Sequence, residues 1–304
     1  MAFKSGFIAI IGRPNVGKST LLNLLTGEKV AIMSNKPQTT RHTIRTVLTT
    51  KEYQMIFVDT PGIHKPKNKL GEYMMQEVFS TFDGVDLIVY MVDGKDKKIG
   101  PGDSMIIGKL EKTGIPTILL INKVDLVEKS SLLPLIAQYN EAFDFDEIIP
   151  ISAVDPKTKA QILETIQGLL PEGEMFYPED MLTDQQEKVL AQELIREKLL
   201  NLLSDEIPHG IGVEVTGFKE KNNKKIIEID ANIYCEKESH KGIIIGKDGK
   251  VLKRVGTLAR QDMERLFDSK VFLNLWVKVK DDWRNSDFML NELGYNEKKG
   301  SSHL

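Results

Sequence analysis

The residue types best suited to phosphate chemistry lie in one glycine-rich segment, GRPNVGKS, at residues 12–19. It matches the sequence G-x-x-x-x-G-K-[ST], in which backbone N–H groups surround phosphate oxygens at the start of a helix. Lys18 is expected to reach the β- and γ-phosphates, and the Ser19 hydroxyl to bind Mg²⁺. The segment therefore predicts a nucleoside triphosphate site formed by Gly12, Arg13, Pro14, Asn15, Val16, Gly17, Lys18, Ser19 and Thr20.

A second pattern, NKVD at residues 122–125, indicates which base is bound. The Asp125 carboxylate can accept the N1–H and 2-amino hydrogens of guanine, and adenine has no such pair of donors. Because an unpaired carboxylate against ATP would be costly, this residue favours GTP and GDP. Asn122 is expected to brace the loop, and the Lys123 stem to lie over the base. The ISA sequence at residues 151–153 is expected to add Ser152 and the Ala153 N–H beside guanine O6.

A third pattern, DTPG at residues 59–62, supplies a carboxylate at the end of an apolar run. Asp59 is expected to hold Mg²⁺ through water, and the Gly62 N–H to contact the γ-phosphate. The two residues between them complete the predicted nucleotide-binding set: Thr60 and Pro61.

The segment SNKPQTTRHT at residues 34–43 is polar and has no periodicity. Thr40 is the predicted hydroxyl that completes Mg²⁺ coordination with Ser19 and Asp59, and Thr39 is the alternative. Such loops order around a γ-phosphate and relax after hydrolysis. Three basic side chains nearby could act in catalysis or contact RNA, but their setting favours a solvated loop surface: Arg41, His42 and Arg45.

These patterns require a scaffold, and short apolar runs alternate with segments of helical length. The runs predict strands at residues 7–11, 55–59, 85–93, 117–122 and 147–152, and a helix is predicted at residues 18–25. Near-continuous apolar strands separated by helices indicate a parallel sheet covered on both faces. We therefore predict a doubly wound, mainly parallel α/β domain at residues 1–175, followed by a linker at residues 176–182.

The rest of the chain has a different pattern. A helix is predicted after a capping pair at Thr183 and Gln186, followed by two alternating strands, two helical pieces around GKDG and a last alternating strand. This order predicts a small α+β domain over residues 183–282, with a C-terminal helix and tail at residues 283–304. Trp276 and Trp283 are interpreted as packing residues rather than as a stacking platform.

Charge and composition narrow the class of protein. Residues 240–280 hold 10 Lys and Arg against 4 Asp and Glu, although the whole chain carries a net charge of −3. Such a stretch is typical of a polyanion-binding face, and a solvated charged helix is the alternative that charge alone leaves open. A single cysteine and the lack of a long apolar run argue against a disulfide framework, a cysteine-rich zinc site or a membrane span.

Residues 1–175 resemble a translation-factor-class P-loop GTPase domain, with the five sequence boxes of that class in order. The loop Gly246-Lys247-Asp248-Gly249 between two helices resembles that of a type II KH domain, which clamps about four nucleotides through its backbone. One GTPase domain followed by one KH domain resembles the Era family over essentially the whole chain. The resemblance places RNA contacts at Gly246, Lys247, Asp248, Gly249, Lys250, Lys253 and Arg254.

The Era resemblance implies a GTP-hydrolysing switch that binds small-subunit rRNA near its 3′ end and assists small ribosomal subunit assembly. It further implies a weak association with the cytoplasmic face of the membrane. The single cysteine, Cys235, fits a reducing cytoplasm, and we expect a monomer that binds no DNA. Ile63 follows the DTPG sequence where Ras-type enzymes have a glutamine that orients water, so we expect slow hydrolysis and assign no catalytic residue. Asn15 resembles the ligand of an activating K⁺ ion in related GTPases, and Lys18, Thr40 and Gly62 are expected to stabilise phosphate.

Two other classes compete with this interpretation. An ATP-using P-loop kinase or helicase conflicts with Asp125 and with the lack of an acceptor-binding domain. An RNA-modification GTPase or a tandem-domain ribosomal GTPase would need a further domain or a second phosphate loop, and neither pattern is found in the sequence.

Overall fold

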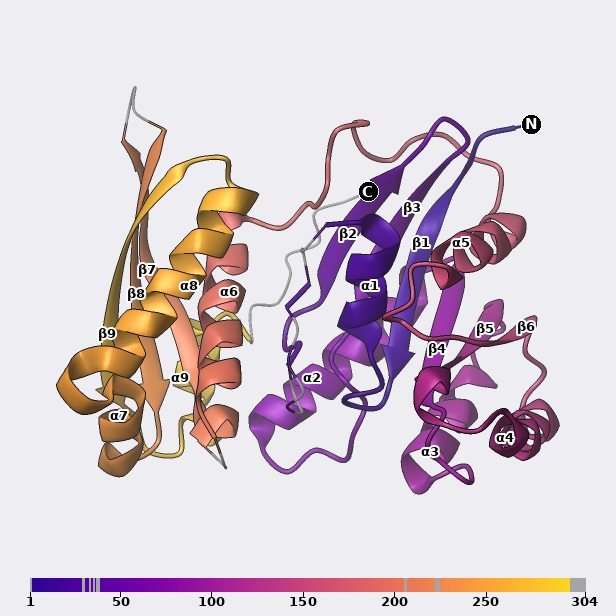
Figure 1. Cartoon of the computed structure of the whole chain (residues 1–304), viewed down its shortest axis with the longest axis horizontal. Coiled ribbons are helices and arrows are strands. Elements are labelled where there is room, and N and C mark those ends of the chain that lie inside the picture. Colours follow the sequence, from indigo (N-terminus) through magenta and orange to yellow (C-terminus); the bar gives the residue numbers. More distant parts are fainter. Residues whose placement is uncertain are drawn as a thin grey trace. The chain divides into compact units, whose positions relative to one another are not determined.

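The computed structural model describes residues 2–28, 31–32, 34, 36, 39–204, 207–221 and 225–295. The main division between its two compact units falls between Asp184 and Gln185. A six-stranded sheet forms the first unit and a three-stranded sheet the second (Figure 1). Parts of three predicted segments lie outside the described residues: 35 and 37–38 in the polar loop, 222–224 in the turn between the alternating strands, and 296–304 in the C-terminal tail.

The first sheet is parallel except at one edge. Its strands lie in the order β2 (Ile44–Thr49), β3 (Tyr53–Asp59), β1 (Lys4–Gly12), β4 (Leu87–Asp93), β5 (Thr117–Asn122) and β6 (Glu147–Pro150). The mainly parallel sheet is confirmed, and β2 is an additional strand that runs antiparallel to β3. The sequence analysis missed β2 because its polar residues interrupt the apolar run that marks the other strands.

Helices bury both faces of this sheet. They are α1 (Lys18–Thr26), α2 (Lys69–Ser80), α3 (Pro101–Leu110), α4 (Lys129–Ala142) and α5 (Thr158–Leu169). Leu21 and Leu25 of α1 share one core with Ile162 and Ile166 of α5. On the opposite face, Tyr90 of β4 contacts Tyr139 of α4 and donates a hydrogen bond to α3. This double coverage explains why the central strands consist almost entirely of buried apolar residues.

The carboxyl ends of the parallel strands bring the predicted nucleotide residues to one edge. Ile10, just before the phosphate loop, pairs with Asp59, and Asp93 pairs with Asn122. Ligands of open α/β sheets bind at this edge. The register thus places the three sequence patterns beside one another.

The predicted linker contacts the first unit closely. Gln54 Nε2 donates to the Tyr177 carbonyl oxygen at 2.8 Å, and the Val47 N–H donates to the Leu182 carbonyl oxygen at 2.8 Å. The Thr183 hydroxyl donates to the Arg45 carbonyl oxygen at 2.6 Å. The capping pair predicted at Thr183 is therefore wrong, because the next helix begins later, after Gln186.

The second unit has the predicted order helix–strand–strand–helix–helix–strand. Its elements are α6 (Glu187–Leu202), β7 (Gly212–Lys221), β8 (Ile226–Cys235), α7 (Glu238–Ile245), α8 (Lys250–Leu266) and β9 (Lys270–Val279). The sheet order is β7-β8-β9, antiparallel and then parallel. Apolar residues of α6 and α8 share a core with one face of this sheet. A short helix, α9 (Asp287–Glu292), follows β9.

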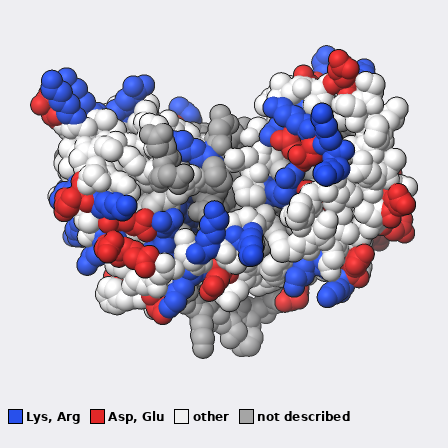
Figure 2. Space-filling model, turned by 90° about the horizontal axis from the view of Figure 1, so that it is seen from below, with Lys and Arg blue, Asp and Glu red and all other residues white. Residues whose placement is uncertain are grey.

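The two tryptophans of this unit differ in burial. Trp283 is fully buried, and its Nε1–H donates to the Gly210 carbonyl oxygen at 2.8 Å. Trp276 is 49% exposed, so the packing interpretation is wrong for this residue. The reason is the alternation of β9: its odd-numbered side chains enter the core, and the even-numbered ones face away from α6 and α8. Within the described residues, no helix is long and apolar enough to cross a membrane. Basic and acidic side chains are interspersed over the face of the molecule seen in Figure 2.

Candidate functional site

The phosphate loop connects β1 to α1 and buries its lysine. Lys18 Nζ donates to the carbonyl oxygens of Gly12 and Arg13, both at 3.1 Å. Burial lowers the pKa of Lys18 to about 8, and the nearby Asp59 carboxylate only partly opposes this shift. A phosphate beside Nζ would restore the charged form. The loop therefore holds a desolvated cation that an anionic ligand would stabilise.

The three residues predicted to hold Mg²⁺ meet next to this lysine. The hydroxyls of Ser19 and Thr40 donate to Asp59 Oδ2 at 2.9 and 3.1 Å, and the two hydroxyl oxygens are 3.1 Å apart. Burial raises the pKa of Asp59, and Lys18 opposes the shift. The alternative residue, Thr39, instead donates its hydroxyl to the Lys36 carbonyl oxygen at 2.6 Å.

This cluster fits Mg²⁺ by its chemistry. All its ligands are oxygens, which a small hard cation prefers, and Asp59 supplies one carboxylate. Asp59 Oδ1 is also buried, and no described residue donates a hydrogen bond to it. A dication would lower the pKa of Asp59 and compensate its burial. Ser19, Thr40 and Asp59 are thus the residues of this chain that would hold the metal.

The segment after Asp59 contacts the phosphate loop directly. A Cβ atom on Gly62 would lie 2.7 Å from Pro14 Cα, so only glycine allows this approach. The Ile63 N–H donates to the Gly12 carbonyl oxygen at 3.0 Å, and Ile63 itself is buried. The Thr60 hydroxyl donates to Ile10 of β1 at 2.8 Å. Ile63 is buried and offers no polar side-chain group that could orient water, and slow hydrolysis stays a prediction.

The residues predicted to recognise the base form a second loop cluster. Asn122 Nδ2 donates to the Val16 carbonyl oxygen at 2.7 Å, and Asn122 Oδ1 accepts the Ala153 N–H at 2.8 Å. Asn122 therefore joins the phosphate loop to the ISA loop, in which Ser152 is buried. The Asp125 side chain is exposed in this loop. It remains available to accept hydrogen bonds from a guanine base.

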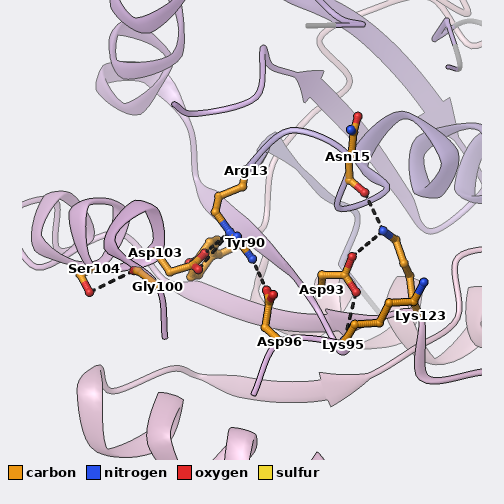
Figure 3. A network of polar contacts seen from close by, with 10 residues as sticks. All are labelled: Arg13, Asn15, Tyr90, Asp93, Lys95, Asp96, Gly100, Asp103, Ser104 and Lys123. Atoms are coloured by element: carbon orange, nitrogen blue, oxygen red, sulfur yellow. Dashed lines mark hydrogen bonds and ion pairs between the residues drawn. The ribbon is translucent and has the colours of Figure 1, made fainter. Parts of the chain in front are cut away.

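An acidic network that the sequence analysis missed surrounds the phosphate loop (Figure 3). Arg13 Nε donates to buried Asp103 of α3 at 3.0 Å, and the other end of its guanidinium forms an ion pair with Asp96. The Tyr90 hydroxyl donates to Asp103 at 2.8 Å. The side chain of Arg13 therefore anchors the phosphate loop to α3 and Asp96, which leaves its backbone as the part predicted to contact phosphate.

Lys123 extends this network to the far side of the loop (Figure 3). Its Nζ donates to the Asn15 carbonyl oxygen at 2.8 Å and forms an ion pair with Asp93 at 2.5 Å. Asn15 has a left-handed backbone with φ of 65°. Asp93 could have been found in the sequence, because it ends β4 at the same sheet edge as the other patterns.

The polar loop before β2 differs from its sequence-based interpretation. Arg41 was expected on a solvated surface, yet it is buried. It directly follows Thr40, whose hydrogen bond to buried Asp59 draws this backbone inward. Arg45 is exposed and forms an ion pair with Asp184 at 3.1 Å.

The GKDG loop joins α7 to α8 through a short 3-10 turn. Gly246 has φ of 73°, and a Cβ there would lie 2.4 Å from the Val251 side chain, so glycine is required. Asp248 and Gly249 also have positive φ, which turns the chain sharply into α8. The positive end of the α8 dipole lies at this turn. The loop geometry therefore suits close approach of a phosphate backbone.

Basic side chains around this loop remain in solvent. Lys247, Lys250, Lys253 and Arg254 are all exposed, and the Lys250–Asp248 pair is loose at 3.9 Å. Ile243, which precedes the loop on α7, is 50% exposed and offers an apolar surface that the sequence analysis missed. The loop combines free positive charge with a surface on which a base can pack.

Comparison with known proteins identifies the family. A model of the 50S ribosome-binding GTPase family matches residues 7–123, and a KH domain model matches residues 206–284. GTPase Era of Ruminiclostridium cellulolyticum is 58% identical over 299 residues, which cover 98% of this chain and 100% of that protein. The chain belongs to the Era family of GTPases. Era of Clostridioides difficile is 54% identical over 97% of this chain and 100% of its own length.

Solved Era structures share the fold of this chain. An Era crystal structure in complex with MgGDPNP and nucleotides 1506–1542 of 16S ribosomal RNA has a TM-score of 0.91 and 40% identity, covering 96% of this chain and 99% of its own. A variant of Aquifex aeolicus Era bound to GDP·AlF4⁻ has a TM-score of 0.91 and 39% identity, with the same coverage. This Era-family chain is therefore a GTPase with a C-terminal KH domain, as its two family matches also indicate.

Proposed function

We propose that this GTPase is a switch that binds the 3′ region of small-subunit rRNA through its KH domain during assembly of the small ribosomal subunit. The observation that carries the proposal is the pairing of a GTP site with an exposed GKDG loop in one chain. The Era structure that contains MgGDPNP and 16S rRNA supports the same pairing. A protein that acts in assembly of the small ribosomal subunit is expected in the cytoplasm. The Era resemblance also implies a weak association with the inner surface of the membrane.

The geometry of the first unit supports GTP hydrolysis assisted by Mg²⁺. When bound, the metal would neutralise charge on the β- and γ-phosphates. Lys18 is held in the phosphate loop by its hydrogen bond to the Gly12 carbonyl oxygen, and the Gly62 backbone packs against Pro14 of the same loop, so the Lys18 ammonium and the Gly62 N–H are the expected donors to phosphate. Such fixed donors stabilise charge that develops in the transition state. Because Ile63 supplies no group that orients water, basal turnover is expected to be slow.

We also propose that Asn15 helps to hold an activating K⁺ ion. Asn15 lies in the phosphate loop with its side chain exposed, and its carbonyl oxygen is fixed by Lys123. A cation near the β- and γ-phosphates would take the role that an arginine finger has in other GTPases. GTP hydrolysis should be severalfold faster in KCl than in NaCl, and Asn15→Ala should remove the difference. Equal rates of the unmodified protein in both salts contradict this proposal.

The rRNA proposal is tested by equilibrium binding of the full chain. The probe is a fluorescent RNA with the sequence of the last 37 or so nucleotides of small-subunit rRNA, and a scrambled RNA of equal length is the control. Binding should favour the native sequence and should weaken steeply with added salt, because phosphate contacts release counterions. Measurements with a GTP analogue and with GDP show whether the nucleotide changes RNA affinity. Equal affinity for both RNAs would overturn the sequence-specific part of the proposal.

A further inference from the structure

One surface of the KH unit has no role in the function described above. The even-numbered residues of β9 and its extension face away from the core that α6 and α8 share with the sheet. Two of them are large aromatic residues in solvent: Phe272 is 57% exposed and Trp276 is 49% exposed. We call this row the β9 stripe; it consists of Lys270, Phe272, Asn274, Trp276, Lys278 and Lys280.

The charged members of the β9 stripe are all basic. Lys278 and Lys280 are exposed, and neither has an ion-pair partner among the described residues. Lys270, at the other end, forms a long ion pair of 3.6 Å with Glu264. The stripe therefore combines two exposed rings with two cations that are free to bind an anion.

β8 presents no carboxylate beside the Trp276 end of the stripe, and Glu214, which lies across from Asn232 on β7, accepts hydrogen bonds from Asn232 and Tyr234. In the β8–β9 register, Trp276 lies beside Asn232 and Lys278 lies beside Tyr234, both of which are neutral. The acids of β8 lie toward the Phe272 end and are engaged. Glu228 forms an ion pair with Lys221 at 2.9 Å, and Asp230 accepts a hydrogen bond from Asn274 at 2.8 Å.

We propose that the β9 stripe is a second contact surface for single-stranded RNA, on which bases stack on Trp276 and Phe272 while Lys278 and Lys280 bind phosphates. Aromatic rings stack on any base, and a basic track beside them binds the backbone. The two rings are four residues apart on one strand, or about 13 Å at ~3.3 Å per residue, so each ring takes a different base.

This surface is distinct from the GKDG loop. The loop leads into α8, and α8 packs on the face of the sheet opposite the stripe. The β9 stripe would therefore contact nucleotides that lie outside the segment clamped by the loop. The inference rests on the proposed RNA-binding function and extends it from about four clamped nucleotides to a longer strand.

Protection of a sheet edge explains only part of the stripe. β9 is an edge strand, and lysines on such strands block pairing with other chains. Two exposed aromatic rings on the same strand work against that protection, because they add apolar surface. Edge protection thus accounts for the lysines and leaves Phe272 and Trp276 unexplained, whereas RNA stacking accounts for both.

The test compares two single-stranded RNAs of 5 and 15 nucleotides from the same rRNA 3′ region, bound to the full chain. Phe272→Leu combined with Trp276→Leu keeps apolar side chains but removes both rings. We expect this variant to bind the 15-nucleotide RNA about tenfold more weakly and the 5-nucleotide RNA without change. Trp276→Phe, which keeps a ring, should retain most of the affinity. Phe176→Leu removes an exposed ring in the GTPase unit and is the matched control.

Tryptophan fluorescence provides an independent readout. The chain has 2 tryptophans, and only Trp276 is exposed, so RNA that stacks on it should quench the exposed fraction of the emission. Trp276→Phe should abolish the quenching. The inference would be wrong if the double variant bound the 15-nucleotide RNA as tightly as the unmodified protein and if RNA did not quench the fluorescence of the unmodified protein. Contact with another protein would then be the remaining explanation for the two exposed rings. Failure of the unmodified protein to bind either RNA would contradict the proposed function itself.

Discussion

Lys18 and Lys247 are both expected to bind phosphate, but the two units present them in different ways. Lys18 is buried, donates to two backbone carbonyl oxygens and lies near a buried carboxylate. Lys247 is exposed on a turn whose shape depends on Gly246. The nucleotide site is thus assembled from desolvated charges before any ligand binds, whereas the RNA site consists of solvated charges on a fixed backbone.

This difference has an energetic consequence. Buried charges are costly in the empty protein and are compensated by the ligand, so they couple ligand binding to pH and to stability. Solvated charges cost little to hold, and their effect on binding is screened by salt. Substitutions in the two units should therefore differ in the size of their effect on ligand binding. They should also differ in whether they change stability, pH dependence or salt dependence.

The largest effect is expected for Lys18→Met. GTP hydrolysis should fall about thousandfold, because one preorganised donor to the transferred phosphate is lost. The free energy of unfolding of the nucleotide-free protein should stay the same or rise, since a desolvated charge is replaced by an apolar chain of similar length. Phosphate release and thermal unfolding check the two parts. A variant that is both inactive and clearly less stable would mean that Lys18 mainly holds the loop together.

A smaller but more selective change is expected for Asp125→Asn. The amide presents a donor where guanine also has donors, so GTP affinity should fall about hundredfold and xanthine nucleotides should bind better. Because Asp125 is exposed, stability should not change. Competition between GTP and XTP on the purified variant measures the switch. Unchanged GTP affinity would remove the NKVD sequence from base recognition.

In the KH unit, Lys247→Asp should reduce rRNA affinity about tenfold, or by roughly 1.4 kcal/mol. The substitution keeps both glycines of the loop and places a negative charge against phosphate. The loss should shrink at high salt, where the native contact is already screened. Fluorescence anisotropy at two salt concentrations gives the affinities. Basal GTP hydrolysis serves as the internal control and should not change, because Lys247 lies outside the unit that hydrolyses GTP.

Sequence patterns predicted most of what depends on local order along the chain. The apolar runs marked five strands of the first sheet, and the alternation in the second unit gave its order of elements. Ser19, Thr40 and Asp59 were grouped from sequence, and the structure places their oxygens within hydrogen-bonding distance. These residues could be grouped because parallel strands end at a common edge.

What the sequence left undetermined depends on tertiary packing. Nothing in the spacing of Asp96 and Asp103 links them to Arg13, because the contact depends on where α3 packs against the sheet. Trp276 is a different case: the Val and Leu residues at the odd-numbered positions of β9 already marked the core face, and the packing interpretation of Trp276 overlooked this alternation. Arg41 was placed on the surface because polarity was used as a measure of exposure, yet the structure buries it directly after Thr40, which donates a hydrogen bond to buried Asp59.

The smallest predicted effect is a dependence of GTP affinity on pH, which distinguishes the buried nucleotide site from the solvated RNA site. Burial lowers the pKa of Lys18 to about 8, so above this pH the empty protein loses the Lys18 proton. A bound phosphate raises that pKa again, and nucleotide binding then takes up a proton. GTP affinity should therefore fall as pH rises, by about fourfold between pH 7 and pH 8.5. The stability of the empty protein should move in the opposite direction, because the folded state favours neutral Lys18 relative to the unfolded chain.

Lys18→Arg provides the matched control for this pH effect, because arginine stays protonated over the whole range. Its GTP affinity should be lower than that of the unmodified protein but independent of pH between 7 and 8.5. Nucleotide affinity is measured by equilibrium titration at constant ionic strength, with thermal unfolding of the nucleotide-free protein in the same buffers. If the unmodified protein and Lys18→Arg lost affinity in parallel, the pH dependence would come from a group other than Lys18. The pH dependence of GTP affinity would then give no support for the difference between the desolvated phosphate site at Lys18 and the solvated one at Lys247.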